Sequence, residues 1–587
     1  MKKLGLLAAL AALAVLLCGC SAKQTASDLC SVVWEDNEEI LFRNQVFTVP
    51  RGSDLTVTVS IPQGKRVASV SYSGSTVSAC IQETAARRDF QITLPAVRYP
   101  TLVRLTLLPD YTTLYRCEGS EPILVTETSE RLRCNSLPWQ PSFSREGQYP
   151  LGWRVDGMEG CIGFGSRFDH SPAQTMALEC HWMPCTSAEA FDYTIRDGGA
   201  VITGYAGTGS ILIPDKLGGF PVVGIAGHAF GAVEAEMLAL PHTLQFIQPG
   251  AFQSLKAEHV YLFDSLCQIS DDSFGESVIS HLHIHAATEP VYCGTYFDTL
   301  SEKVDYLSQV RESPKIILFC GSSARFGYNS PMLEAAFPGY RVVNMGVYAY
   351  SNMLPQAMLL EGYLQEGDIV LSSPELDAID TQFCGSSRLD SEFFAMMESN
   401  YQMLADLNLS GLEGIFDALG EYLQVRQGMT PRSYLDIPAH FDEDNHPSAA
   451  LSYNRQGDYM LHRPGNTDGK LFGIKRAYYN AAHIREADFQ GLNRVYDRFR
   501  ERGAAVYFTY SPRSERSISA DSDSASIAAL DQAFREKLHV PVISPIQDSL
   551  MDAYYFYGTD NHLTTEGAAI HTNAVIRDLR RALEETP

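Results

Sequence analysis

Beyond its first twenty residues, the sequence lacks any segment that is long and apolar enough to span a membrane. It is also poor in basic residues, with 45 Lys and Arg against 70 Asp and Glu and a formal net charge of −25. Such an acidic chain is not expected to bind nucleic acid or an anionic lipid surface. None of its 13 cysteines lies in a CxxC motif or at the Cys/His spacing of a zinc site, so we expect no metal and no other cofactor.

The N-terminal segment Met1–Cys20 joins two lysines to a continuous Ala/Leu run that is too short for a transmembrane helix, which is typical of a signal peptide. Its last four residues, Leu17-Cys-Gly-Cys20, resemble the lipobox of bacterial lipoproteins. This resemblance implies cleavage before Cys20, lipidation of its sulfur, and an extracytoplasmic, membrane-anchored protein at the bacterial cell surface. Plain secretion is the alternative.

The length of 587 residues is too great for one core and predicts several domains. Residues 30–130 contain segments such as Leu55–Ile61, in which apolar and polar residues alternate, and we expect a β-sandwich-like domain there. Residues 135–185, which end in Leu178-Glu-Cys-His-Trp182, resemble the Listeria–Bacteroides repeat, a β-grasp module of surface proteins. The resemblance implies that Trp153 and Trp182 are its core aromatics.

Residues 190–286 carry an internal repeat of 22 residues. Three apolar positions recur at this spacing: Ile225, Ile247 and Ile269; Phe230, Phe252 and Phe274; and Leu240, Leu262 and Ile284. A fixed period of this length predicts a solenoid, in which each unit buries its apolar residues against its neighbours. Phrases such as Gly227-His-Ala-Phe-Gly231 resemble the BspA-type leucine-rich repeat, and so short an array is expected to be a spacer or a small recognition surface.

Residues 310–587 alternate short apolar segments with helical patterns, which predicts an α/β doubly wound parallel sheet. The expected strands are Lys315–Phe319, Tyr340–Val343, Ile369–Ser372, Ala504–Tyr510 and Val540–Ser544. The expected helices include Leu354–Gln365, Glu486–Arg502, Ser526–Lys537 and Thr565–Glu585. An insertion at about 391–480, with helices Phe393–Leu407 and Leu412–Arg426, is interpreted either as a cap over the site or as a surface insertion without a role.

The first of these strands runs into Gly321-Ser-Ser323, a turn that can present a nucleophilic serine at the edge of a sheet. Together with Asn344-Met-Gly346 and Asp560-Asn-His562, this turn resembles the conserved blocks of the SGNH or GDSL-like hydrolase superfamily. The resemblance implies Ser323 as the nucleophile, His562 as the base and Asp560 as the acid that orients His562. It also implies that the N–H groups of Ser323 and Gly346 form the oxyanion hole.

The sequence departs from the superfamily pattern in three places. Gly-Asp-Ser is Gly-Ser-Ser here, and Asp-x-x-His is Asp-x-His, so that Thr559 stands where the acid is expected. The Gly-x-Asn-Asp block is absent, and Ser373 or Asn352 could replace its oxyanion donor. The Gly-Ser-Ser turn is similar to that of extracytoplasmic acyl-transfer relatives, such as the D-alanyl transfer protein of teichoic-acid modification.

Two other groups of residues could carry chemistry. Glu375, which follows the strand Ile369–Ser372, is interpreted either as a site acid or as a cap for the next helix. His281, His283 and His285 alternate along one strand and could ligate a metal, but the repeat register favours a solvent-facing position.

We therefore predict a cell-surface lipoprotein with a serine esterase or O-acyltransferase domain that acts on acyl groups of cell-envelope glycans or glycopolymers. Its expected partners are the membrane, through the N-terminal lipid, and a glycan or other surface ligand. The alternative is a surface binding or adhesion protein whose SGNH-like domain is catalytically degenerate.

Overall fold

The computed structural model describes residues 29–34, 40, 46–62, 65–73, 80–83, 89–97, 100–109, 111–127, 133–155, 160–169, 175–288, 290–292, 297, 299–347, 352–384, 389–409, 412–428, 453–459, 463–471 and 476–585. The lipidation candidate Cys20 lies outside these ranges. The chain has several sheets and forms two compact units, Met1–Leu107 and Leu108–Pro587. Within the described ranges, no helix has both the length and the apolar character needed to cross a bilayer.

The described residues of the first unit form strands in two sheets. One sheet has the order β2-β1-β7-β4, formed by Val46–Pro50, Leu29–Trp34, Thr101–Pro109 and Lys65–Ser73; the other has the order β3-β6-β5, formed by Ser53–Ser60, Asp89–Val97 and Cys80–Glu83. In β3, Leu55 and Val59 are buried while Thr56 and Thr58 are exposed, as the alternating sequence predicts. Trp34 and Leu94 belong to the apolar core that these strands enclose.

The second unit begins with a sheet whose order is β11-β13-β8-β9, formed by Gln148–Val155, Thr175–Pro184, Tyr111–Arg116 and Ile123–Glu127. A two-stranded ribbon of β10 (Arg133–Asn135) and β12 (Arg167–Asp169) accompanies it. The sequence assigned residues 111–127 to the preceding domain, but β8 pairs in parallel with β13. The alternation of apolar and polar residues predicts a strand, but it does not predict which distant strand will pair with it. Trp153 is fully buried, with its ring 5.0 Å from that of Tyr115.

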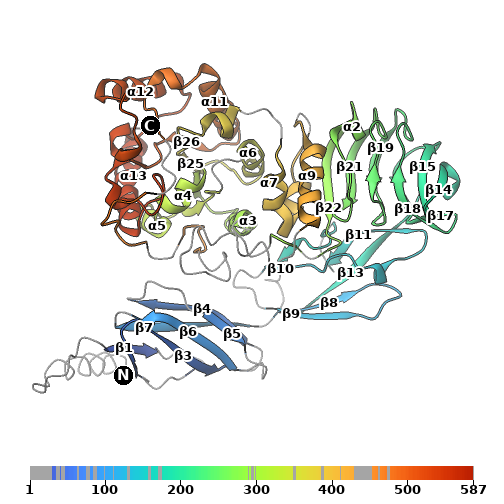
Figure 1. The fold of residues 1–587 in the computed structure, drawn as a ribbon, viewed down its shortest axis with the longest axis horizontal. Coiled ribbons are helices and arrows are strands. Elements are labelled where there is room, and N and C mark those ends of the chain that lie inside the picture. The colour runs from blue at the N-terminus through green and yellow to red at the C-terminus, as the bar shows by residue number, and fades with distance from the viewer. Residues whose placement is uncertain are drawn as a thin grey trace, which may run out of the picture. The chain divides into compact units, whose positions relative to one another are not determined.

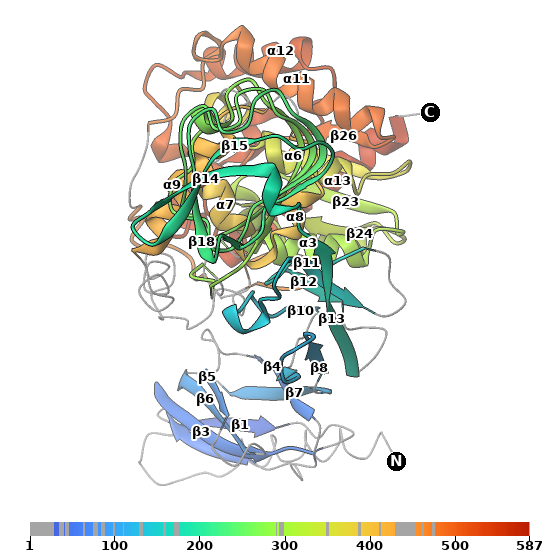
Figure 2. The same cartoon turned by 90° about the vertical axis from the view of Figure 1, so that its right-hand side faces the viewer.

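The region of the 22-residue repeat forms two sheets (Figures 1 and 2). In one sheet all the strands are parallel: β16 (Ile211–Leu212), β19 (Glu234–Ala239), β21 (Lys256–Phe263) and β22 (Val278–His285). In the other, β15 (Gly199–Tyr205), β18 (Phe220–Ile225) and β20 (Phe246–Ile247) are parallel, whereas β14 (Phe191–Arg196) and β17 (Lys216–Leu217) pair antiparallel with β15 and β18. Glu234 pairs with Lys256, and Lys256 pairs with Val278. The rings of Phe230, Phe252 and Phe274 form a ladder with centroid spacings of 4.6 and 5.1 Å.

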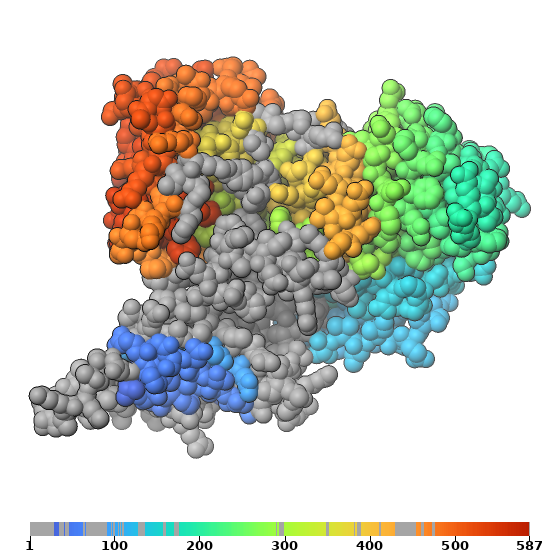
Figure 3. Space-filling model, in the orientation of Figure 1, coloured from blue at the N-terminus to red at the C-terminus, as the bar shows by residue number. Residues whose placement is uncertain are grey.

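Helices from the insertion at 391–480 pack against the end of this stack. The short helix α2 (Asp271–Phe274) closes the last repeat, and Phe416 of α9 (Ile415–Gln427) extends the ladder, with its ring 3.9 Å from that of Phe274. Asp271 Oδ1 accepts from Phe416 N at 2.9 Å, and Asp417 Oδ1 accepts from Asp271 N at 2.9 Å. In Figure 3 the orange atoms of the insertion lie directly against the green atoms of the repeats. The described helices α7 (Ser391–Met397), α8 (Gln402–Ala405) and α9 therefore belong to the interface between the repeats and the C-terminal region.

The C-terminal region contains a parallel sheet with the order β24-β23-β25-β26, formed by Arg341–Asn344, Lys315–Phe319, Ile369–Ser372 and Ala505–Phe508. The helices around it are α3 (Thr299–Gln309), α4 (Ser322–Gly327), α5 (Ser330–Ala336), α6 (Leu354–Glu361), α11 (Glu486–Glu501), α12 (Ser524–Lys537) and α13 (Thr565–Glu585). The expected strand Val540–Ser544 is reduced to a single bridge between Val542 and Phe508.

Both faces of this parallel sheet are covered. On one face, Ile316 and Leu318 share an apolar core with Leu579 of α13. On the other face, the ring of Phe319 lies 5.2 Å from that of Phe499 in α11. This two-sided burial explains why Ile316–Phe319 are all apolar and why every side chain of the strand is buried. Its first residue, Lys315, is buried in an ion pair with Asp368, with Nζ 2.6 Å from Oδ2. The loops at the carboxyl ends of these strands meet at one edge of the sheet, where the candidate site lies.

Candidate active site

Two adjacent serines at the start of α4, which follows β23, have different partners. Ser322 Oγ lies 3.0 Å from Nε2 of His562, whereas Ser323 Oγ donates to Glu375 Oε1 at 2.6 Å. The structure thus brings His562 to the serine next to the one chosen from the sequence. Ser322 and His562 are only 5% and 6% exposed, so their contact is shielded from water.

His562 is held by its own loop and by α4, the helix that begins with the two serines. Tyr557 N donates to His562 O at 2.7 Å, and His562 N donates to Thr559 Oγ1 at 3.1 Å. The imidazole ring stacks on Phe326 of α4, with centroids 4.1 Å apart and planes 22° from parallel. These contacts fix the ring so that Nε2 faces Ser322.

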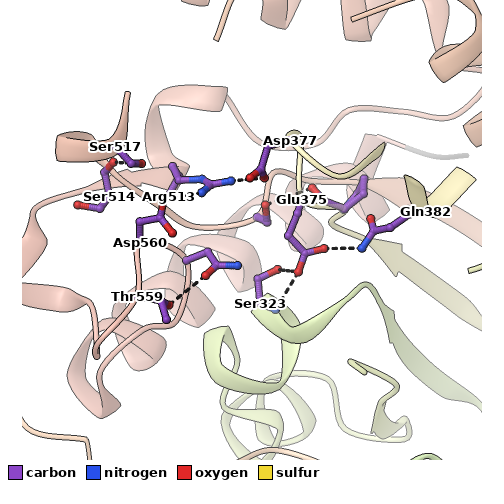
Figure 4. Close-up of polar contacts among 12 residues, drawn as sticks. Ser323, Glu375, Asp377, Gln382, Arg513, Ser514, Ser517, Thr559 and Asp560 are labelled. Carbon is purple, nitrogen blue, oxygen red and sulfur yellow. Dashed lines mark hydrogen bonds and ion pairs between the residues drawn. The ribbon is translucent and has the colours of Figure 1, made fainter. Parts of the chain in front are cut away.

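Ser323 belongs to a buried network around Glu375 (Figure 4). Glu375 Oε1 accepts from both the backbone N of Ser323, at 2.9 Å, and its hydroxyl, while Oε2 accepts from Gln382 Nε2 at 2.9 Å. A Cβ on Gly321 would lie 2.6 Å from Glu375 Oε2, so only glycine permits this close approach. Glu375 therefore anchors the turn through Ser323, a role that neither sequence interpretation of Glu375 had assigned to it.

Asp560 lies in the same loop as His562 but has a different partner. Its Oδ2 accepts from Arg513 Nη1 at 2.8 Å, and Arg513 Nη2 also donates to Asp377. Figure 4 shows Arg513 between these two carboxylates. The backbone O of Asp560 accepts from Ser514 N at 2.8 Å. The Asp560 carboxylate thus neutralises a buried arginine. Its contacts in the described part of the chain do not include the His562 ring, which it was expected to orient.

The two backbone donors expected in the oxyanion hole are near the site but already engaged. Ser323 N donates to Glu375, and Gly346 N donates to Asn344 Oδ1 at 3.0 Å. Gly346 does pack closely on α4, because a Cβ at this position would lie 2.7 Å from Arg325 N. The sheet therefore brings the two predicted loops together, but their N–H groups bond to protein side chains.

Neither of the two alternative oxyanion donors contacts the Ser322–His562 pair in the described contacts. Ser373 Oγ accepts from the hydroxyl of Tyr328 at 3.2 Å. Asn352 Oδ1 accepts from Leu354 N at 3.0 Å, at the start of α6.

Buried arginines set the electrostatics of the site. Burial, together with the positive charges of Arg325, Arg463 and Arg513, lowers the pKa of His562 to about 3. The imidazole is therefore neutral at physiological pH, and its Nε2 can accept a proton from Ser322. Burial also lowers the pKa of Arg463, to about 10, which leaves this guanidinium charged.

The later part of the insertion supplies one wall of the site. Tyr459 N donates to Arg325 O at 3.0 Å, and Arg325 Nη1 donates to the hydroxyl of Tyr453 at 3.0 Å. Arg463 Nη2 donates to Phe326 O at 3.3 Å. These contacts place aromatic and cationic side chains of the insertion directly on α4, beside the Ser322–His562 pair.

Sequence reasoning missed Ser322 and the arginines for different reasons. Successive residues at a helix start point about 100° apart, and residue type alone does not say which of two adjacent serines faces the histidine. The preference for Ser323 came from aligning it with the last residue of Gly-Asp-Ser. Arg325 and Arg463 lie in no motif, and their approach to His562 depends on tertiary packing. The one usable signal was the pair of neighbouring serines itself.

Of the three histidines of β22, which the repeat register was expected to turn to solvent, His285 is buried and the other two are half-buried. His285 is 1% exposed, and His281 Nδ1 lies 3.0 Å from the backbone O of Ala405 in α8. The insertion covers this face of the repeats, which the repeat sequence alone could not reveal. Over the described ranges, no group of three or more His, Cys, Asp or Glu side chains is arranged to hold a metal ion.

Comparison with known proteins does not place the chain in a family. No protein-family model matches the sequence, and no curated protein is similar to it. The function must therefore be inferred from the geometry of the site.

Proposed function

We propose that the C-terminal region is a serine esterase or O-acyltransferase in which Ser322 is the nucleophile and His562 the general base. The observation that carries this proposal is the 3.0 Å contact between Ser322 Oγ and His562 Nε2 at the carboxyl edge of a parallel sheet. A serine hydroxyl is a poor nucleophile at neutral pH and needs a base within hydrogen-bond distance. A neutral, positioned imidazole meets this requirement.

The chemistry would proceed in two steps. His562 Nε2 takes the proton of Ser322 as Oγ bonds to the ester carbonyl, and then gives that proton to the departing alcohol, which leaves an acyl group on Ser322. In the second step the same nitrogen takes a proton from water or a glycan hydroxyl as that oxygen bonds to the acyl carbon, and it returns the proton to Ser322 Oγ as the acyl–Oγ bond breaks. The positive charge of Arg325 and Arg463, which lowers the pKa of His562, would stabilise the negative oxygen that forms in each step.

The proposed substrates are acyl esters of cell-envelope glycans or glycopolymers, reached by a lipoprotein anchored at the cell surface. The support for this location is the lipobox-like Leu17–Cys20, and the strongly acidic composition suits an exposed surface protein. The repeat and β-modules ahead of the catalytic region would hold it away from the membrane.

A second candidate is a binding protein whose hydrolase-like region is inactive. The observation that favours it is that Asp560 pairs with Arg513, while the N–H groups of Ser323 and Gly346 are already bonded. The carboxylate expected to orient His562 and the N–H groups expected in the oxyanion hole thus bond to other protein groups.

A fluorophosphonate probe, which reacts only with an activated serine, distinguishes the two candidates. We expect the wild type to be labelled, Ser322→Ala to lose the label, and Ser323→Ala, the matched neighbour, to keep it. If only Ser323→Ala loses the label, the nucleophile is Ser323, as the sequence predicts, and not Ser322. A folded wild type that takes no label and hydrolyses no acetyl ester would favour the binding protein.

A further inference from the structure

A cavity of about 550 Å³ lies where three segments of the second unit meet. Its walls come from β11, β13 and the loop 160–166, from strands β21 and β22 of the repeats, and from α8 with the residue before it. The volume is within the range of about 300–1,000 Å³ that small-ligand pockets occupy. No residue of the Ser322–His562 pair or its arginines lines this cavity, so it is separate from the proposed catalytic site.

Stacked rings form the wall on the repeat side. Tyr261 of β21 and His283 of β22 lie 4.1 Å apart with their planes only 8° from parallel, and His283 Nε2 lies 3.1 Å from His259 Nδ1. Because each ring covers a face of its neighbour, the wall offers ring edges and their polar atoms to a ligand. Burial lowers the pKa of His283 to about 3, so its imidazole is neutral at physiological pH.

Two polar side-chain atoms of the lining are buried without a hydrogen-bond partner. His285 and Ser166 are each 1% exposed, and in the described structure neither His285 Nε2 nor Ser166 Oγ makes a hydrogen bond. His285 Nδ1 accepts from Phe164 N at 3.4 Å, so the neutral ring carries its proton on Nε2. Burial lowers the pKa of His285 to about 3, which keeps the ring neutral. A buried donor without an acceptor is costly, and a ligand oxygen would relieve that cost.

Among the described residues that line the cavity, the charge is opposite to that of the whole chain. The chain carries a formal net charge of −25, yet the described lining contains no Asp or Glu, and it includes the cationic Arg154. Leu151, Ile284 and Ala405 add apolar surface between the polar groups. The cavity thus offers several donors and one cation, interleaved with apolar patches.

We propose that this cavity binds an acidic saccharide of one or two rings. A sugar ring has apolar C–H faces and hydroxyl edges, which match the alternation of apolar and polar groups in the lining. A carboxylate or phosphate on the sugar would pair with Arg154, and other sugar oxygens would accept from His285 Nε2 and Ser166 Oγ. The repeats and the module 135–185 would then form a glycan-binding site that works independently of the serine chemistry.

Calorimetric titration of the full chain tests the proposal, with digalacturonate, glucose 6-phosphate and neutral maltose as probes. We expect one or both acidic sugars to bind and maltose to bind more weakly by about tenfold or more, because a charge-assisted contact is lost. Binding of digalacturonate alone would assign the carboxylate as the ligand group, and binding of glucose 6-phosphate alone would assign the phosphate.

Two variants and one control make the result specific to the cavity. Arg154→Gln should weaken binding of the acidic sugar by about tenfold or more, and Ser166→Ala, which removes a hydroxyl with no protein partner, should weaken it several-fold. Arg145→Gln is the matched control, since this arginine pairs with Glu118 outside the cavity. Melting curves confirm that each variant folds. The proposal is overturned if no acidic sugar binds at millimolar concentration, if maltose binds equally well, or if Arg145→Gln weakens binding as much as Arg154→Gln.

Discussion

At the scale of single residues, the serine turn divides two tasks between neighbouring side chains. Ser322 meets His562, while Ser323 gives both its backbone N–H and its hydroxyl to Glu375. Because Glu375 also holds Gln382, it ties the turn to the chain that follows β25. A buried carboxylate that accepts several hydrogen bonds makes this turn rigid, and rigidity is what a nucleophile needs to keep its distance from its base.

Glu375→Gln should therefore destabilise the protein. The substituted amide would either present a donor to the donors of Ser323 or lose the bond from Gln382, and an unsatisfied buried group costs about 1–3 kcal/mol. Chemical denaturation measures this loss, with the exposed Glu366→Gln as the control for removing one negative charge. An unchanged free energy of unfolding would mean that the network contributes nothing to stability.

The pH dependence of probe labelling should report the electrostatics of the site. His562 is reactive only when neutral, and burial with nearby arginines lowers its pKa to about 3, so neutral imidazole is present above that pH and lost below it. We expect the labelling rate to change little between pH 8 and 5. With an ordinary histidine pKa of about 6.5, the neutral fraction of the imidazole, and with it the labelling rate, would fall about 30-fold over the same range. Circular dichroism at each pH checks that the protein stays folded. A midpoint near the ordinary histidine value would contradict the buried, cationic environment.

At the scale of elements, the sequence predicted most of the C-terminal helices and strands because their patterns are local. Lys315–Phe319 and Thr565–Glu585 match β23 and α13 at both ends. The sequence could not show that β8 would join β13, or that Val540–Ser544 would make only one bridge, because both depend on distant partners. The same limit applies to the site: the converging loops were predicted, but the pairing of Ser322, Glu375 and Arg513 was not.

The phenylalanine ladder gives a test of the repeat core. Phe252 is fully buried between Phe230 and Phe274, so Phe252→Ala should lower the free energy of unfolding by about 3–5 kcal/mol through lost contacts and a cavity. Phe220→Ala is the control, because Phe220 lies on β18 in the same repeats but is 41% exposed. If the two variants melt alike, the ladder is not a stabilising core.

At the scale of the whole molecule, the proposal of a surface lipoprotein depends on the N-terminus, which lies outside the described residues. We expect Cys20 to be the first residue of the mature protein and to carry lipid, as Leu17–Cys20 implies. Metabolic labelling with a palmitate analogue should mark the wild type and leave Cys20→Ala unmarked. Label that persists in Cys20→Ala, or a wild type that never takes label, would favour plain secretion instead.

The packing of α9 against the last repeat restricts where further repeats can be added to the array. Repeat arrays gain length when a unit is duplicated, and a new unit must stack on an end that accepts one. Here that end is occupied: Phe416 sits on Phe274, and α9 passes so close that a Cβ on Gly420 would lie 2.3 Å from Ile269 O. A duplication after residue 286 would push the helix and the attached catalytic region away together. Natural sequences related to this chain should therefore gain or lose repeats inside the array or at its first turn. The last repeat should always occur together with the C-terminal region.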